Sequence, residues 1–115
     1  MATANDLRRL ALALEGTTEA PHFDRAAFKV ARIYVTLAAD RKTANFKFTP
    51  DEQEFKCMLA PGAFAAIPNA WGRQGWTTAT LARLKVVELR SALETAWQHA
   101  VPAKPKRARK TRSGK

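Results

Sequence analysis

The feature that most constrains the fold is a change of hydrophobic period at Ala26. Within residues 5–15, Leu7, Leu10 and Leu14 recur at the spacing of one helix face. From Ala26 to Phe48, apolar side chains instead alternate with polar ones, which is typical of strands that bury one face. A chain that combines the two patterns predicts helices packed on a sheet around one core.

The alternating region predicts strands over residues 26–30, 33–37 and 44–48. A hairpin between the first two would turn at Ala31 and Arg32, neither of which favours positive φ, so two strands and one long bent strand both remain open. The preceding segment, TTEAPHFDR, is predicted to be a polar connection.

The same alternation assigns side chains to the two faces of an antiparallel meander. Phe28, Val35 and Phe46 fall on the apolar face, and Tyr34 and Lys47 fall on the opposite one. The meander is therefore expected to have one buried face.

A helix is predicted to begin at Pro50, with Thr49 as its N-cap and Glu52 completing a capping box. Its buried stripe is expected to consist of Phe55, Met58 and Leu59.

Two further elements follow near the C-terminus. WTTATL, residues 76–81, predicts a strand, and residues 84–101 predict the longest helix, with Trp97 on its apolar face. His99, in the last turn, is interpreted as a polar surface group near the negative end of the helix dipole.

The order of elements contains no strand-helix-strand repeat of the kind that builds a parallel sheet. It predicts an α+β fold, an antiparallel β-sheet with helices packed on one face. Residues 1–103 form this single domain, and residues 104–115 are expected to be a disordered basic tail.

The net charge of +10 is divided unevenly between these two parts. The tail carries seven of the 20 basic residues and no acid, which leaves a mildly basic domain. Such a tail can bind phosphates by counterion release, or it can serve only to solubilise the chain or bind acidic partners in general. The tail cations predicted to contact nucleic acid are Lys104, Lys106, Arg107, Arg109, Lys110 and Arg112.

Several classes of protein are disfavoured by what the sequence lacks. It has no long apolar run, and Asp6, Arg8 and Arg9 interrupt the N-terminus where a secretion signal would need apolar residues, so a cytoplasmic protein without membrane association is expected. Cys57 is the only cysteine, which excludes an internal disulfide. No phosphate-binding loop, nucleophile motif or metal-binding histidine pair occurs, so we expect no enzyme, metal or cofactor.

Two short segments carry candidate binding residues. In PHFDR, His22 and Asp24 share a face if the segment is extended, and the ring could then act as a base or as a donor to an anion. The plainer interpretation is a polar loop anchored by Phe23.

The second segment is PNAWGRQGWTTATL, residues 68–81. Gly72 and Gly75 favour a tight reversal that presents Arg73, a side chain suited to phosphate or to a guanine edge. Whether Trp71 or Trp76 packs against the core stays open, because either choice of the buried face of the strand leaves a side chain in an unfavourable environment.

The chain resembles the MmcQ/YjbR family of small bacterial proteins over roughly residues 5–101. The resemblance lies in PHFDRAAFKV, VTLA, NFKFTPDEQ, PNAWGRQGWT and LRSALETAW. It implies an α+β fold with an antiparallel sheet, likened to a double-wing DNA-binding arrangement, and hence DNA as the partner. Where many relatives have a Gly-Lys hairpin, this chain has Ala31-Arg32, which keeps a cation at that turn.

The leading hypothesis is therefore a monomeric, non-enzymatic DNA-binding module. Its domain would contact the phosphate backbone through Lys29, Arg32, Lys47 and Arg73.

The alternative is a protein-interaction or small acidic-ligand module, in which His22, Asp24, Trp71 and Trp76 line a cleft. An enzymatic role would require His22 to approach Asp24 and Arg73 in one pocket.

Overall fold

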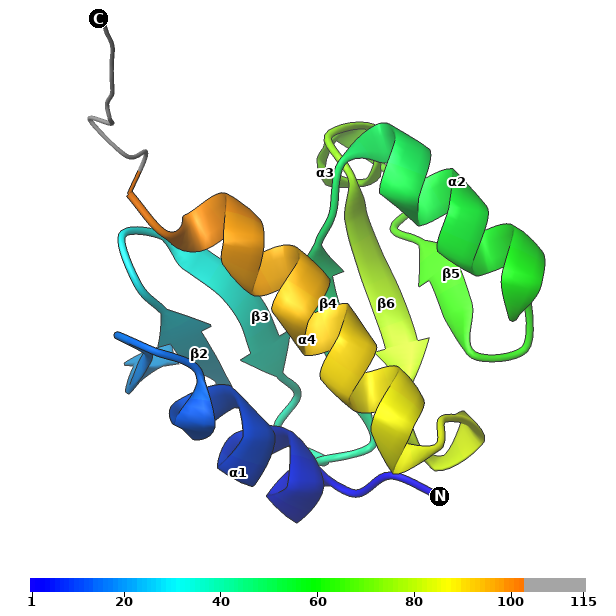
Figure 1. Cartoon of the computed structure of the whole chain (residues 1–115). Coiled ribbons are helices and arrows are strands. Elements are labelled where there is room, and N and C mark those ends of the chain that lie inside the picture. Colours follow the sequence, from blue (N-terminus) through cyan, green and yellow to red (C-terminus); the bar gives the residue numbers. More distant parts are fainter. Residues whose placement is uncertain (103–115) are drawn as a thin grey trace, which may run out of the picture.

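The computed structural model describes residues 1–102 and contains one sheet with helices packed against it (Figure 1). The helices are α1 (Ala4–Ala13), α2 (Pro50–Leu59), α3 (Ala70–Arg73) and α4 (Val86–Ala100), with a single 3-10 turn at Leu81–Arg83. The strands are β1 (Thr18–His22), β2 (Arg25–Lys29), β3 (Ile33–Leu37), β4 (Thr43–Lys47), β5 (Phe64–Ala66) and β6 (Trp76–Thr80).

The six strands form one antiparallel sheet in the order β1-β2-β3-β4-β6-β5. Helices α1 and α4 lie together over one face of this sheet (Figure 1). The core lies between them, where Leu7 of α1 and Leu93 of α4 are buried with Phe28, Val35 and Phe46 of the sheet. The prediction of an antiparallel sheet with helices on one face is confirmed.

The predicted start of α2 is also confirmed. The Thr49 hydroxyl accepts from the Glu52 backbone N–H, and the Glu52 carboxylate accepts from the Thr49 N–H, which completes the capping box of α2. Thr3 and Asp6 form the equivalent box at the start of α1.

The prediction that TTEAPHFDR is only a connection is wrong, because β1 lies within it. β1 pairs with β2 along its whole length, and the chain reverses at Phe23 and Asp24. β1 is an edge strand with mostly exposed side chains, so it carries no apolar alternation, and an edge strand also tolerates Pro21.

The β2–β3 hairpin turns through residues 30–32 without positive φ, so the alternating region forms two strands. The pairing shifts at Lys29, where two β3 residues, Ile33 and Tyr34, meet one β2 residue. Contrary to the simple alternation, the buried Tyr34 therefore turns to the helix side, and its hydroxyl lies 3.4 Å from the Ala11 carbonyl oxygen.

The predicted burial of the α2 stripe is wrong. Phe55, Met58 and Leu59 are 54%, 69% and 66% exposed. Helix α2 lies beside β5 at the edge of the sheet, and within residues 1–102 no element covers this side of it (Figure 1). Its periodicity correctly predicts an amphipathic helix, but the apolar face is not in the core.

Candidate nucleic-acid interface and adjoining cleft

The segment after β5 forms a short helix, α3, rather than the predicted reversal between β pieces. Asn69 caps this helix, since its Oδ1 accepts from the backbone N–H of Trp71 at 2.9 Å and of Gly72 at 3.4 Å. Arg73 ends α3 and is exposed, so it projects from a helix end and not from a hairpin tip.

Two positions in this segment require glycine, because neighbouring backbone atoms leave no room for a Cβ. A Cβ at Gly72 would lie 1.6 Å from the Ile67 carbonyl oxygen. Gly75 has φ of 110°, and a Cβ there would lie 1.8 Å from the carbonyl oxygen of Phe48. The segment is thus held tightly against the end of β4.

The tryptophans that flank these glycines differ in exposure. Trp76, the first residue of β6, is half-buried, whereas Trp71 is 60% exposed. The side-chain amide of Gln53 on α2 donates to the carbonyl oxygens of Gly72 and Trp76, both at 2.9 Å. The segment is therefore fixed by backbone contacts, and Trp71 is left on the surface.

The four candidate cations of the domain gather at one end of the sheet. Because neighbouring strands are antiparallel, the β2–β3 turn, with Lys29 and Arg32, lies beside the end of β4 at Lys47 and the start of β6. Arg73 comes just before β6. We call Lys29, Arg32, Lys47 and Arg73 the cationic end of the sheet.

The end of α4 reaches the same place. The Ala31 N–H in the β2–β3 turn donates to the Ala100 carbonyl oxygen at 3.0 Å. Figure 1 shows this turn beside the C-terminal end of α4 at the upper left, and α3 further to the right at the upper end of β6. The tail cations from Lys104 to Arg112 lie outside the described residues, but the described chain ends beside the cationic end.

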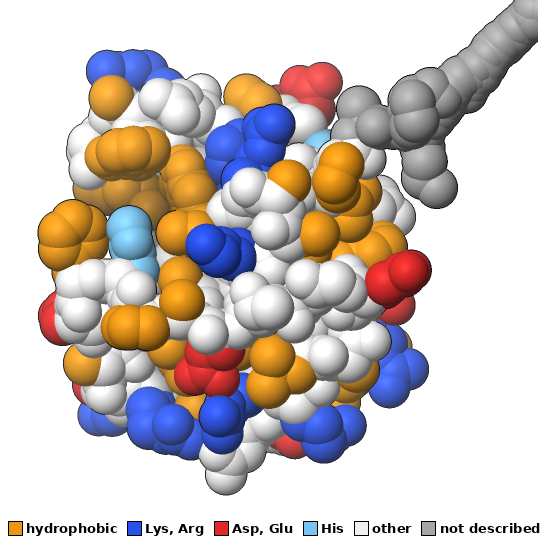
Figure 2. Space-filling model, turned by 90° about the vertical axis from the view of Figure 1, so that its left-hand side faces the viewer, with side chains coloured by type: hydrophobic (Ala, Val, Ile, Leu, Met, Phe, Trp, Pro, Cys, Tyr) orange, Lys and Arg blue, Asp and Glu red, His pale blue; other side chains and the backbone are white. Residues whose placement is uncertain are grey.

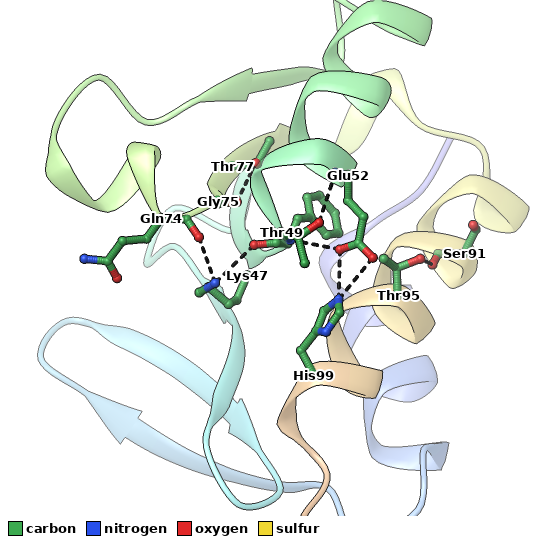
Figure 3. A network of polar contacts seen from close by, with 10 residues as sticks. Lys47, Thr49, Glu52, Gln74, Gly75, Thr77, Ser91, Thr95 and His99 are labelled. Atoms are coloured by element: carbon green, nitrogen blue, oxygen red, sulfur yellow. Dashed lines mark hydrogen bonds and ion pairs between the residues drawn. The ribbon is translucent and has the colours of Figure 1, made fainter. Parts of the chain in front are cut away.

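Lys47 is the most enclosed of these cations. Its Nζ donates to the carbonyl oxygens of Gln74 at 2.8 Å and Phe48 at 3.1 Å (Figure 3). Burial lowers the pKa of Lys47, and the nearby charge of Arg32 lowers it further, while Glu52 opposes both. Lys47 therefore fastens α3 to β4 and adds positive charge near Arg32.

A cleft of about 330 Å³ adjoins this region on the face of the sheet opposite α1 and α4. His22, Phe23 and Arg25 form one side, and Thr36 and Asn45 lie on its floor. The rings of His22 and Phe23 meet edge to face, with centroids 4.8 Å apart.

The other side of the cleft comes from the α3 segment and contains Asn69, Trp71 and Trp76. The structure thus brings His22 together with both tryptophans of the second sequence segment. Asp24 does not line this cleft and instead borders an adjoining hollow beside α1, which shares Phe23 and Arg25 with the cleft. In Figure 2, hydrophobic side chains gather around a histidine on the left of the view, with Lys and Arg side chains nearby.

The approach of His22 to Asp24 and Arg73, considered above for a catalytic base, is not found in the described part of the chain. His22 is exposed and makes no hydrogen bond with Asp24 within residues 1–102. The same residues contain no cluster of three His, Cys, Asp or Glu side chains able to hold a metal ion.

None of the helices among the first 102 residues has the length and hydropathy needed to cross a membrane.

The model of the YjbR family matches residues 12–99, most of the chain. The chain belongs to the YjbR family. This match includes the β2–β3 turn, both sides of the cleft and α3, and it ends before the basic tail.

Two crystal structures share the YjbR-like fold. The Deinococcus radiodurans protein DR2400, a DUF419 domain, has a TM-score of 0.71 and 24% identity, over 84% of this chain and 76% of its own. A Pseudomonas syringae protein has a TM-score of 0.60 and 16% identity, over 80% of this chain and 93% of its own. No curated protein matches the chain. These two structures establish the YjbR-like fold, and the match of the family model establishes the family.

Sequence reasoning missed Arg25, Thr36, Asn45 and Asn69 as residues of the cleft. Alternation along β4 does place Asn45 opposite the buried Phe46, but nothing in the sequence marks it as part of a site. Arg25, Thr36 and Asn45 meet because β2, β3 and β4 are neighbours in the sheet, and the start of α3 brings Asn69 to the same cleft.

Proposed function

We propose that this chain is a non-enzymatic DNA-binding protein whose cationic end contacts the phosphate backbone. The observation that carries the proposal is the convergence of Lys29, Arg32, Lys47 and Arg73 at one end of the sheet, beside the end of the described chain. Lys29, Arg32 and Arg73 are exposed there, and no acidic side chain lies within 4 Å of their charged groups in residues 1–102. Exposed cations that are free of ion pairs gain most from releasing the counterions of DNA.

The proposed division of labour is that the domain positions the duplex and the tail adds affinity. Arg32 and Arg73 present planar guanidinium groups that can hold two phosphate oxygens each. The seven cations beyond residue 103 would contribute binding that is independent of sequence. The protein would act in the cytoplasm and as a monomer.

Binding of a labelled duplex, measured by fluorescence anisotropy at about 50 and about 200 mM salt, tests the proposal. We expect Arg73→Ala to weaken binding and to reduce the salt slope by about one. Arg83→Ala is the matched control, since Arg83 is an exposed arginine beyond the far end of β6.

A chain that ends at residue 103 separates the domain from the tail. If this shortened chain does not bind duplex while the full chain does, the tail alone binds and the cationic end is not an interface. If the full chain does not bind at the lower salt, the proposal is wrong.

A second candidate function is binding of a small acidic or aromatic ligand. It is supported by the cleft that joins His22 to Trp71 and Trp76. Calorimetric titration with small aromatic carboxylates tests it, and Trp71→Ala should remove the heat of binding.

A further inference from the structure

The cleft next to the cationic end has aromatic side chains on both sides. Trp71 is 60% exposed and Phe23 is 93% exposed, so both rings retain most of their surface for another molecule. Phe23 has a φ of 59°, which is unfavourable for a bulky residue, and the β1–β2 turn holds it there. Residues kept in such conformations cluster at ligand sites, and the turn displays an aromatic ring at this one.

The floor of the cleft offers hydrogen-bond donors. Asn45 Oδ1 accepts from the Thr78 hydroxyl at 2.8 Å, and within residues 1–102 the Asn45 amide nitrogen makes no hydrogen bond. Arg25 donates from Nε to the Thr36 hydroxyl at 2.8 Å and from Nη2 to the Thr36 carbonyl oxygen at 3.3 Å, which leaves Nη1 free of protein partners among the described residues. Arg25 also has no carboxylate partner in this part of the chain.

The side chains of the cleft define the chemical features of a ligand that could bind there. A ligand that fits between the aromatic side chains must be planar, and a ligand that satisfies the Asn45 amide and the Arg25 guanidinium must carry acceptor oxygens. Asp24, which would repel such oxygens, lies in the neighbouring hollow.

The cleft also adjoins the cationic end at Trp76. Lys47 and Trp76 are directly paired between β4 and β6, and their side chains lie on the same face of the sheet. Arg73 lies two residues after Trp71, in the same short helix. Because Trp76 lines the cleft and Lys47 is its direct strand partner, a ring held in the cleft would have its attached phosphates near Lys47.

We propose that the cleft binds an unpaired pyrimidine base, whose carbonyl oxygens accept from Asn45 and Arg25 while its ring stacks on Trp71. The inference rests on the proposed function, because the cationic end would hold the phosphates on either side of the base. It adds a preference for single strands, since a base inside a duplex has its ring faces covered by its neighbours. A free nucleotide presents the same ring, and the experiment distinguishes the two sources.

Three labelled probes separate base binding from backbone binding with the full-length chain. They are a short oligothymidine, an abasic oligonucleotide of the same length and a duplex. We expect the oligothymidine to bind on the order of tenfold more tightly than the abasic strand. Trp71→Ala should remove this difference, and Asn45→Ala should reduce it severalfold, while duplex affinity stays within about twofold.

Val87→Ala is the control, because Val87 is 68% exposed on α4, on the helix side of the sheet away from the cleft. It should leave all three affinities unchanged. Circular dichroism of each variant verifies that it is folded.

The outcomes separate failure of the proposed base site from failure of DNA binding by the cationic end. If the abasic and oligothymidine strands bind equally while the duplex binds, the base site is wrong and the cationic interface stands. If no strand binds, calorimetry with thymidine monophosphate decides: binding that Trp71→Ala abolishes supports a site for the free nucleotide, and no binding overturns the cleft as a base site.

Discussion

The imidazole Nε2 of His99 lies 2.9 Å from Oε1 and 3.1 Å from Oε2 of Glu52, and this contact joins the last turn of α4 to the first turn of α2 (Figure 3). A carboxylate only accepts, so Nε2 is the donor. Glu52 also accepts from the Thr49 N–H at 2.9 Å, so one carboxylate both caps α2 and attaches it to α4. This attachment is important for α2, since none of its own side chains is fully buried.

Glu52 makes the free energy of unfolding of the domain vary with pH in the acid range. Partial burial raises its pKa, but the hydrogen bonds from Thr49 and His99 outweigh this and lower it below its ordinary value of 4.5. A carboxyl group whose pKa is lower in the folded than in the unfolded state stabilises the fold at pH values above its unfolded-state pKa. This stability is lost as the pH falls through the folded-state pKa. We expect Glu52→Gln to lose less stability than the wild type between about pH 6 and about pH 3, as measured by urea unfolding.

Glu54→Gln is the control for this experiment, because Glu54 is an exposed acid of the same helix that makes no ion pair within residues 1–102. Near neutral pH, Glu52→Gln should be about 1 kcal/mol less stable than Glu54→Gln. Identical acid profiles for the two variants would show that the contact with His99 does not stabilise the fold.

The two glycines of the α3 segment should not tolerate even a methyl group. Gly72→Ala brings a Cβ against the Ile67 carbonyl oxygen, and Gly75→Ala brings one against the Phe48 carbonyl oxygen. Since both obstacles are backbone atoms, the chain must shift, and Gly75→Ala adds strain at positive φ. We expect each variant to lose more than about 2 kcal/mol of unfolding free energy.

Gly62→Ala provides the comparison. The nearest atom to its new Cβ is the end of the flexible Arg83 side chain, at 3.7 Å. Its unfolding free energy should stay within about 0.5 kcal/mol of the wild type. Equal losses at all three glycines would mean that the close contacts are not the cause.

The exposed face of α2 leads to a prediction opposite to that of its sequence pattern. Phe46 is fully buried, so Phe46→Ala should cost about 3–5 kcal/mol of unfolding free energy. Phe55 is 54% exposed, so Phe55→Ala should cost less than about 1 kcal/mol. Urea unfolding of the two variants measures both values, and a cost at Phe55 that approaches that at Phe46 would contradict the observed exposure.

What could be predicted from the sequence depends on how local the determining contacts are. The capping box of Thr49 and Glu52 lies within four residues, so it was predictable. The periodicity of α2 was also predictable, but burial of Phe55 depends on which element covers it, and periodicity does not contain that information. β1 was missed because its pairing with β2, and not its own composition, makes it a strand.

The same distinction applies to the candidate site. Arg73 and Lys47 were identifiable as cations, but only the pairing of β4 with β6 brings them together. His99 was expected to interact with its own helix dipole, and its partner, Glu52, is 47 positions away. Asn45 was not identified because an asparagine on a strand is unremarkable until its neighbours are known.

The strand order also has a consequence for how the chain assembles. Strands β1 to β4 pair with their neighbours in sequence, so they close only short loops. β4 must then pair with β6, which follows α2, β5 and α3 along the chain, and this step closes a much longer loop. We expect this pairing to form late in folding, and until it forms, β4 has an unpaired edge through which two chains could associate wrongly.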